Sequence, residues 1–158
     1  MFCLPENAKI IEAITPQAGA AITGDYVSLK NCNKASVVVH VAQGAADVMA
    51  ISIEQATVVA GTDSKVITNV VPIWSNLDCA ATDTLVRRTD AVNYSLDAGV
   101  KHKMVVFQID PASLDIDNGF DCITVKTAAS NAANITSAAY YLCGLRYAGA
   151  TPPSAILD

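Results

Sequence analysis

The chain has 158 residues, of which 52% are hydrophobic and only 16% are charged. A chain of this length fits one domain, so we expect residues 1–158 to share a single core. The hydrophobic content excludes intrinsic disorder. The net charge of −5, from 10 basic and 15 acidic residues, argues against nucleic acid as a partner. The apolar excess predicts a protein that packs against other proteins.

Short runs of β-branched residues separated by Gly, Pro, Asn and Asp predict strands rather than helices along the whole chain. They are numerous enough for two packed antiparallel sheets, so we expect an all-β sandwich. In chain order the predicted strands are Lys9–Thr15, Tyr26–Lys30, Ser36–Ala42, Val48–Gln55, Lys65–Trp74, Thr84–Arg88, Val92–Leu96, Lys103–Ile109, Asp121–Thr127 and Ala138–Tyr147.

Alternation within these strands predicts their buried faces, because successive side chains point to opposite sides of a sheet. In the strand over 48–55, Met49, Ile51 and Ile53 are expected to face the core. The strand over 121–127 alternates in the same way, so we expect it to have one buried face and one solvent face.

Two places depart from simple alternation. Met104–Phe107 is apolar on both faces, so this strand is expected to be central and covered, or to place Met104 and Val106 in a subunit interface. Tyr140 and Tyr141 are consecutive, so they point to opposite faces, and at least one of them is expected in the core.

Turn chemistry marks the remaining segments. Asn118-Gly119 predicts a tight turn with a positive φ angle. The Ala-rich segment 128–139 contains Ser and Asn residues that compete for backbone hydrogen bonds, so we expect a loop there. Pro152 and Pro153 begin an extended C-terminal arm, because proline excludes a helix.

The first residues lack the basic and apolar regions of a secretion signal. The most apolar window, 35–53, is interrupted by polar residues such as His40 and Asp47. A membrane-spanning helix needs about 20 predominantly apolar residues. We therefore expect no membrane partner.

The five cysteines stand at positions 3, 32, 79, 122 and 143, and none forms a C-x-x-C pair. This spacing makes a zinc site or a thioredoxin-like motif improbable. We expect free thiols that pack as small hydrophobic side chains, notably Cys122 and Cys143, in a protein that assembles in a reducing compartment.

No motif predicts catalysis or metal binding. A Cys32–His40 dyad is the enzyme alternative, but no neighbouring residue marks it, and we predict a protein that is not an enzyme. The acidic run from Asp115 fails the EF-hand calcium pattern at its fifth, sixth and twelfth positions. We therefore expect neither a metal nor another cofactor.

Aromatic residues raise the alternative of a carbohydrate- or receptor-binding sandwich, because Trp74 and the tyrosines are able to stack on sugars. Aromatic residues make up only 6% of the chain, which favours core packing or an interface role for them instead.

Several segments resemble small structural proteins of tailed phages and prophages, and the likeness covers most of the chain. Among these proteins, the chain most resembles the jelly-roll capsid cement, or decoration, proteins. The segments that carry the resemblance are Ala13–Ala20, Val105–Pro111, Gly119–Lys126 and Tyr147–Ile156.

The resemblance implies a jelly-roll β-sandwich with extended arms over 1–8 and 148–158. It implies a virion protein, made in the cytoplasm of a bacterial host, that binds the outer capsid surface as a homodimer or homotrimer and ties major capsid subunits together. Tail-tube and head-completion proteins are the alternatives within the virion. The predicted contact residues are Phe2, Leu4, Pro5, Met104, Val106, Pro152, Pro153, Ile156 and Leu157.

Overall fold

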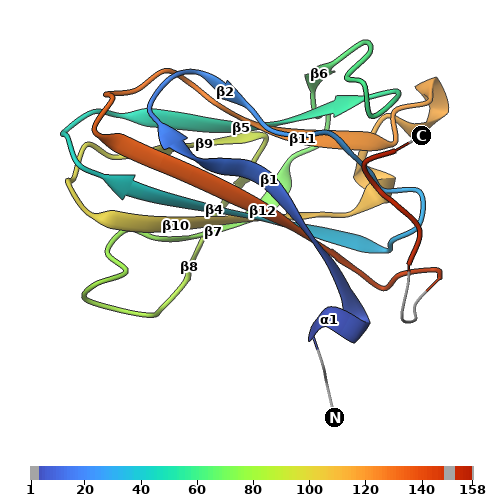
Figure 1. Cartoon of the computed structure of the whole chain (residues 1–158), viewed down its shortest axis with the longest axis horizontal. Coiled ribbons are helices and arrows are strands. Elements are labelled where there is room, and N and C mark those ends of the chain that lie inside the picture. Colours follow the sequence, from blue (N-terminus) through green and yellow to red (C-terminus); the bar gives the residue numbers. More distant parts are fainter. Residues whose placement is uncertain (1–3, 148–151, 158) are drawn as a thin grey trace.

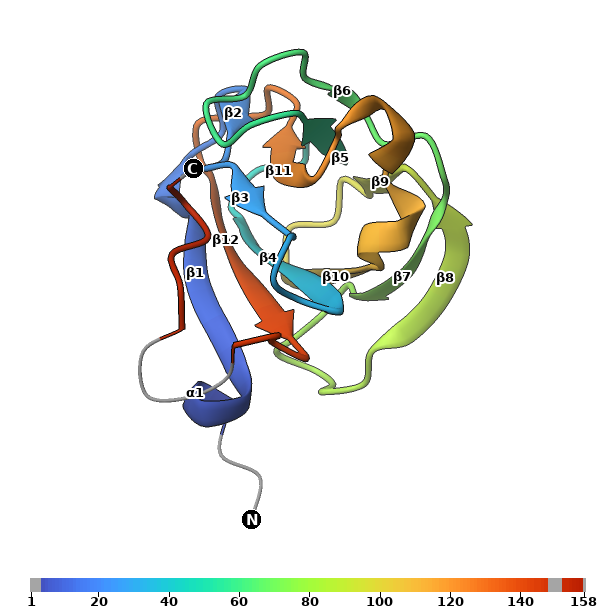
Figure 2. The ribbon, with the colours of Figure 1, turned by 90° about the vertical axis from the view of Figure 1, so that its right-hand side faces the viewer.

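The computed structural model describes residues 4–147 and 152–157, which form two antiparallel sheets packed face to face (Figures 1 and 2). In spatial order, sheet A consists of β1 (Ala8–Ala18), β12 (Asn134–Cys143), β4 (Lys34–Gln43), β10 (His102–Ile109), β7 (Val71–Asn76) and β8 (Val86–Ala91). Sheet B consists of β2 (Ile22–Thr23), β11 (Cys122–Thr127), β5 (Met49–Ala56) and β6 (Lys65–Val66), with β3 (Val27–Ser28) paired to β11 and β9 (Asn93–Leu96) paired to β5. The helical turns are α1 (Leu4–Asn7), η1 (Pro111–Ser113) and η2 (Ile116–Asn118).

The strand order is that of a jelly roll, as predicted. Along the chain β1, β4, β10 and β12 lie in sheet A and β2, β3, β5, β9 and β11 in sheet B, so the chain passes between the sheets repeatedly and stays in sheet B from β5 to β9 apart from an insertion. In both sheets a strand from the C-terminal half lies between two strands of the N-terminal half: β12 separates β1 from β4, and β11 separates β2 from β5. This interleaving of two Greek keys defines the fold.

Strands β6, β7 and β8 are an insertion between β5 and β9. β6 pairs with β5 in sheet B, whereas β7 and β8 extend sheet A beyond β10. The single strand predicted over Lys65–Trp74 is therefore wrong. The chain leaves sheet B after Val66 and enters sheet A at Val71, and the β-branched composition is the same on both sides of the crossing.

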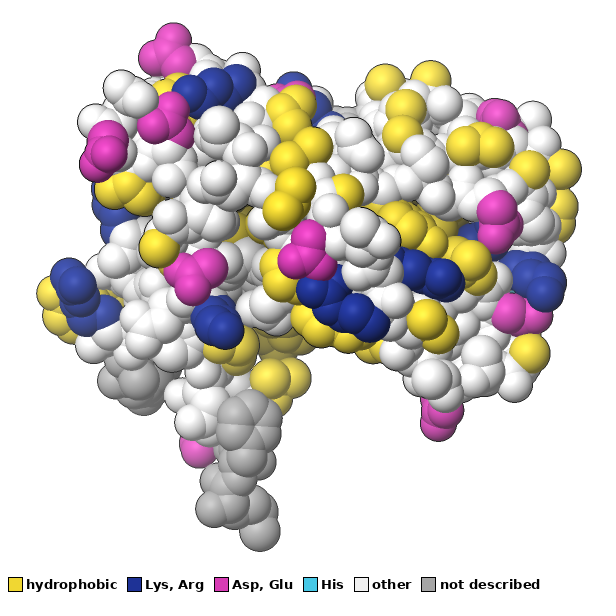
Figure 3. Space-filling view, turned by 180° about the vertical axis from the view of Figure 1, so that it is seen from behind, with side chains coloured by type: hydrophobic (Ala, Val, Ile, Leu, Met, Phe, Trp, Pro, Cys, Tyr) yellow, Lys and Arg dark blue, Asp and Glu magenta, His cyan; other side chains and the backbone are white. Residues whose placement is uncertain are grey.

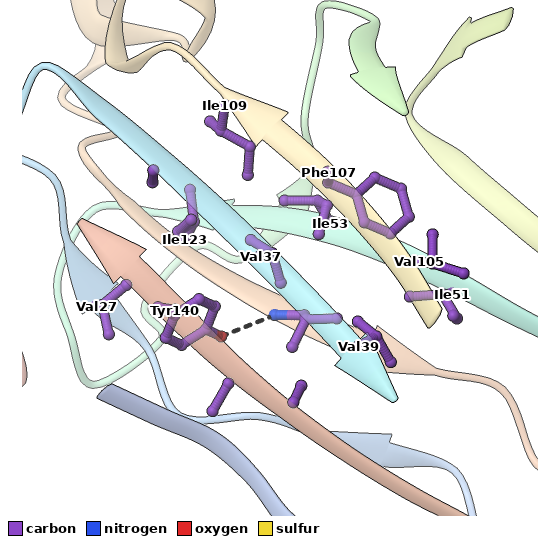
Figure 4. Packing of buried hydrophobic residues seen from close by; sticks show 14 of the residues in the cluster. Val27, Val37, Val39, Ile51, Ile53, Val105, Phe107, Ile109, Ile123 and Tyr140 are labelled. Carbon is purple, nitrogen blue, oxygen red and sulfur yellow. Dashed lines mark hydrogen bonds between the residues drawn. The ribbon is translucent and has the colours of Figure 1, made fainter. Parts of the chain in front are cut away.

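The core lies between the sheets, and the predicted alternation is confirmed there. Met49, Ile51 and Ile53 are at most 1% exposed. Tyr140 is fully buried, and its hydroxyl donates a hydrogen bond to Asp25 O (2.8 Å) and accepts one from Val125 N (3.1 Å). Tyr140 thus joins β12 of sheet A to β11 of sheet B, among apolar side chains from both sheets (Figure 4).

The solvent face predicted for the strand over 121–127 is wrong at two of its positions. Cys122 and Thr124 are fully buried on β11. Segment 24–29 crosses this side of the strand: the Thr124 hydroxyl donates to Gly24 O (2.7 Å), and Leu29 N donates to Asp121 O (2.8 Å). The chain itself therefore covers the face that alternation assigned to water.

The loop predicted over 128–139 is also corrected, because β12 already begins at Asn134. Residues 134–137 pair with residues 40–43 of β4, so cross-strand hydrogen bonds override the weak strand propensity of the segment. Asn134 is fully buried, and its side chain accepts from Ala45 N and donates to Ser130 Oγ. The turn predicted at Asn118-Gly119 is confirmed, with φ +83° at Gly119.

Candidate functional site

The C-terminal segment lies against the first strand. The Lys9 ammonium group donates to Pro152 O (3.4 Å) and also to Pro153 O. Figure 2 shows α1 and the C-terminal segment on the same side of the molecule, next to β1. We call this region the terminal surface and define it by Leu4, Pro5, Pro152, Pro153, Ile156 and Leu157.

The described parts of these arms are more ordered than predicted. Residues 4–7 form α1, and β1 begins at Ala8, which is 2% exposed. In the C-terminal segment, Ala155 is 7% exposed and its carbonyl accepts a hydrogen bond from Ser28 N (2.7 Å). Within the arms predicted over 1–8 and 148–158, residues 1–3, 148–151 and 158 lie outside the described residues. Residues 152–157 lie back on the sandwich, because an alanine small enough to enter the core fixes them there.

The apolar side chains of the terminal surface point outward. Leu157 is 71% exposed, Ile156 is 49% exposed and Leu4 is 40% exposed. Pro5 and Pro153 are also exposed, and Pro152 is half-buried. Phe2, the remaining predicted contact residue of the N-terminal arm, lies outside the described residues. The predicted contact residues of both chain ends thus lie on the same side of the molecule (Figure 2), with α1 near the start of β1 and Ile156 and Leu157 following Ala155, which is bonded to β3.

Met104 and Val106 lie on a second surface, the outer face of sheet A. Their strand β10 is central in the sheet, as predicted, with Val105 and Phe107 fully buried on the other side. Met104 and Val106 are half-buried among outward-facing neighbours of the same sheet. In the middle of this face, strand pairing and alternation place Pro72, Trp74, Ser36, Val38, His40, Ala42, Met104, Val106, Gln108, Ser137, Ala139 and Tyr141.

No formal charge stands at any of these central positions, although 16% of the whole chain is charged. The charged side chains of this face lie at its margins: exposed Lys34 stands at the first position of β4, Glu12 projects from β1, and Arg87 from β8 lies over the Trp74 ring (4.7 Å). Charge depletion is the compositional mark of an interface centre. Met104 and Val106 were predicted because their strand is apolar on both faces, whereas Trp74 and Ala139 join them only through strand pairing.

A third exposed apolar region lies at the edge of sheet A opposite β1, where Leu85 and Val86 are 41% and 47% exposed. Seen from behind, the molecule has a hollowed band of hydrophobic side chains crossed by Lys and Arg side chains (Figure 3). Arg87, Arg88 and Asp90 lie on β8, and charges of this kind protect an exposed edge strand from pairing with other chains.

The enzyme alternative required Cys32 and His40 to be in contact, and the structure separates them. Cys32 is buried before β4, and burial, with a further contribution from Cys143, raises the pKa of its thiol to about 11. His40 lies on the outer face of β4, six residues after the first residue of that strand. Six strand residues span about 20 Å, far beyond hydrogen-bond reach.

Neither the acidic run nor the aromatic residues form a site in the described chain. Asp115 forms an ion pair with Lys65 (2.5 Å), and this contact holds the pKa of the Asp115 carboxyl below its usual value. Residues 4–147 and 152–157 contain no cluster of three His, Cys, Asp or Glu able to hold a metal. Of the aromatic side chains, Tyr140 is in the core, Tyr94 contacts Ser75 and Trp74 lies under Arg87, so they are dispersed.

No helix within the described ranges is long and apolar enough to cross a membrane.

No known family model matches the chain, and no curated protein is similar to it in sequence. Among solved structures it is similar to the SPBc2 prophage-derived protein YomS, with 8% identity, a TM-score of 0.49, and coverage of 86% of this chain and 93% of that one. It is also similar to the CBM22-2 xylan-binding domain of Paenibacillus barcinonensis Xyn10C, with 9% identity, a TM-score of 0.36, and coverage of 87% and 91%. The family 11 carbohydrate-binding module of Clostridium thermocellum Lic26A-Cel5E has 10% identity, a TM-score of 0.33, and coverage of 89% and 85%. No TM-score here reaches 0.5, so no function is transferred from these proteins.

Proposed function

We propose that the chain is a non-enzymatic structural protein of a tailed-phage virion, a cement protein that binds the outer capsid surface. Its partner is the major capsid protein, and the terminal surface makes the contact. The observation that carries this proposal is the set of exposed apolar side chains that both chain ends hold against the same side of the sandwich. The choice of the major capsid protein as the partner rests on the resemblance of the sequence to jelly-roll cement proteins.

A cement protein needs an interface that stabilises its partner without chemistry. A standard protein interface of about 1,600 Å² reaches high affinity through shape and a few apolar anchors. Ile156 and Leu157 suit this role, because Lys9 and the buried Ala155 already fix the segment that carries them. A segment that is ordered before binding loses less conformational entropy when it docks.

The charge of the chain agrees with a position outside the shell. The net charge of −5 disfavours contact with packaged DNA, because nucleic-acid binding depends on basic groups that neutralise phosphates. No cofactor is needed for this function. The protein is made in the cytoplasm of the bacterial host and assembles onto the shell there.

Co-sedimentation with expanded empty shells tests the proposal. The wild type is expected to pellet with the shells, and Leu157→Asp is expected to weaken binding at least tenfold by burying a carboxylate in an apolar contact. Val48→Asp is the matched control: Val48 is 55% exposed, and it lies in the turn between β4 and β5. It is expected to bind as the wild type does.

Two results would contradict the proposal in different ways. A wild-type protein that stays in the supernatant is not a cement protein, and glycan binding by that protein would favour the carbohydrate-binding alternative. Equal binding by wild type and Leu157→Asp would instead remove the terminal surface as the contact.

A further inference from the structure

The outer face of sheet A has a self-complementary pattern. Cross-strand pairing places one residue from each of the six strands in a continuous row. The two edge positions carry opposite charges, and the two central positions carry valines. The position between edge and centre holds a small residue on β12 and a large one on β7. From β1 to β8 the row reads Glu12, Ala139, Val38, Val106, Trp74 and Arg87.

The small residue of the row lines a hollow. Ala139 and Ser137 of β12 form its floor, and Ile10, Glu12 and His40 line its sides. The hollow exists because β12 carries short side chains between the longer ones of β1 and β4. The midline of the row runs between β4 and β10, and at the corresponding position on its other side the row carries a large side chain.

That side chain is Trp74 of β7, which is half-buried and is the only tryptophan in the sequence. The Arg87 guanidinium lies 4.7 Å from its ring centroid, which supports the indole on the side of β8. β12 and β7 each lie about 7 Å from the midline, since strands are spaced about 4.8 Å apart. A hollow and a large side chain at equal distances from a line fit a two-fold axis along that line.

We propose that the outer face of sheet A binds a second copy of this chain across a two-fold axis parallel to the strands. Rotation about this axis places Trp74 of each copy over the Ala139 hollow of the other. It also places Val38 against Val106 and brings Glu12 to the same side as Arg87 of the second copy. An axis perpendicular to the strands would instead oppose Glu12 to Glu12, so the charges select the orientation.

The curvature of the sheet determines which contacts form the centre. Figure 2 shows sheet A bending around the core, with β1 and β8 set back from its middle. The centre therefore consists of β12, β4, β10 and β7, and the two charged residues form a rim. Four strands over six residues cover roughly 19 by 20 Å, so the two copies bury roughly 1,000 Å² in total with the rim. Area alone does not fix affinity, but an interface of this size belongs to the class of weak, transient contacts.

The opposite sheet does not offer such a face. On β5 and β11 the outer positions carry the ion pair Lys126–Glu54 (2.7 Å), and Ser64 donates a further hydrogen bond to Glu54 (2.6 Å). Burying this ion pair against another protein would remove its solvation at a free-energy cost, whereas the middle of the outer face of sheet A, from Ala139 to Trp74, carries no formal charge to desolvate.

Sedimentation velocity between about 1 µM and about 500 µM tests the dimer, and Ala139→Arg tests the hollow. The wild type is expected to change from monomer to dimer over this range, with a blue shift of Trp74 emission on association. Ala139→Arg fills the hollow and is expected to weaken dimerisation at least tenfold. Ala50→Arg is the matched control, because Ala50 is a half-buried alanine on the outer face of β5.

Charge exchange tests the orientation of the axis. Glu12→Arg is expected to weaken the dimer, and addition of Arg87→Glu is expected to restore it to within severalfold. A wild type that remains monomeric, a trimer, or an Ala139→Arg variant that dimerises normally would overturn the proposal. A double variant weaker than both single variants would overturn the axis. These outcomes concern the isolated chain, so they are independent of binding to a capsid.

Discussion

Lys103 is a fully buried cation whose partners predict a measurable, pH-dependent contribution to stability. It points inward from β10, and its ammonium group donates to Asp97 Oδ1 (2.6 Å), Asp97 O (2.8 Å) and Gln43 Oε1 (2.7 Å). These three acceptors satisfy all three ammonium protons. Asp97→Asn removes the only formal negative charge among them and keeps the geometry.

The size of the effect follows from the exposure of the two partners. Breaking a fully buried ion pair costs about 3–5 kcal/mol, whereas an exposed pair contributes about 0.2–1 kcal/mol. The Lys103 side chain is 0% exposed but that of Asp97 is 56% exposed, so solvent screens the carboxylate. We therefore expect Asp97→Asn to destabilise the fold by about 1–2 kcal/mol at pH 7. Asp117→Asn, on the exposed turn η2, is the matched control and is expected to change little.

The sign of the pH dependence is fixed by the Asp97 carboxyl. Its hydrogen bond from Lys103, and a second one from Gly99 N, lower its pKa in the folded state. A carboxyl with a lowered folded-state pKa contributes stability above its unfolded pKa of about 3.9 and loses that contribution as pH falls through the folded value. The difference between wild type and Asp97→Asn is therefore expected to be full at pH 7 and to shrink below about pH 4.

Urea unfolding at several pH values, followed by circular dichroism, measures this difference. The same substitution made in a Lys103→Met background isolates the interaction, because the cation is then absent. A difference that stays constant from neutral to acidic pH, or that is undiminished in the Lys103→Met background, would refute the reasoning.

Three further predictions concern other parts of the fold. Tyr140→Phe leaves Val125 N and Asp25 O without their shared partner, so a loss of about 1–3 kcal/mol is expected in urea unfolding, and an unchanged midpoint would contradict the role of the hydroxyl. Iodoacetamide at neutral pH, mapped by mass spectrometry, is expected to modify the exposed Cys79 well before Cys32, whose pKa is raised to about 11 by burial; equal rates would contradict this. Gly119→Ala is expected to cost about 1 kcal/mol through its positive φ angle alone, since a Cβ there meets no atom within 4 Å, and a loss several times larger would indicate an unrecognised contact.

Strand positions and buried faces could be read from the sequence because each depends on local alternation. Tyr140 and Tyr141 illustrate this, since a period of two places one in the core and the other outside, whatever the topology. Segment 65–74 shows the limit of the approach. Its β-branched residues favour a strand, but only the partners in space decide that Val66 belongs to sheet B and Val71 to sheet A.

The candidate surfaces were only partly predictable for the same reason. Met104 and Val106 were found because their strand is apolar on both sides, which is visible in one segment. Trp74 and Ala139 join that face only through the pairing of strands distant in sequence. In the C-terminal segment, Ala155 lies among Pro, Ser and Ile residues, a local pattern that does not indicate its docking against the core.

Cryo-electron microscopy of the particle that contains this protein is the most direct test of its proposed role. Cement function predicts density for the jelly roll on the outer surface of the shell, at junctions between major capsid subunits, with Ile156 and Leu157 against the shell. Density within the tail lumen or at the portal would assign the protein to the tail or to head completion. Absence of the protein from the particle would contradict a structural role in the virion.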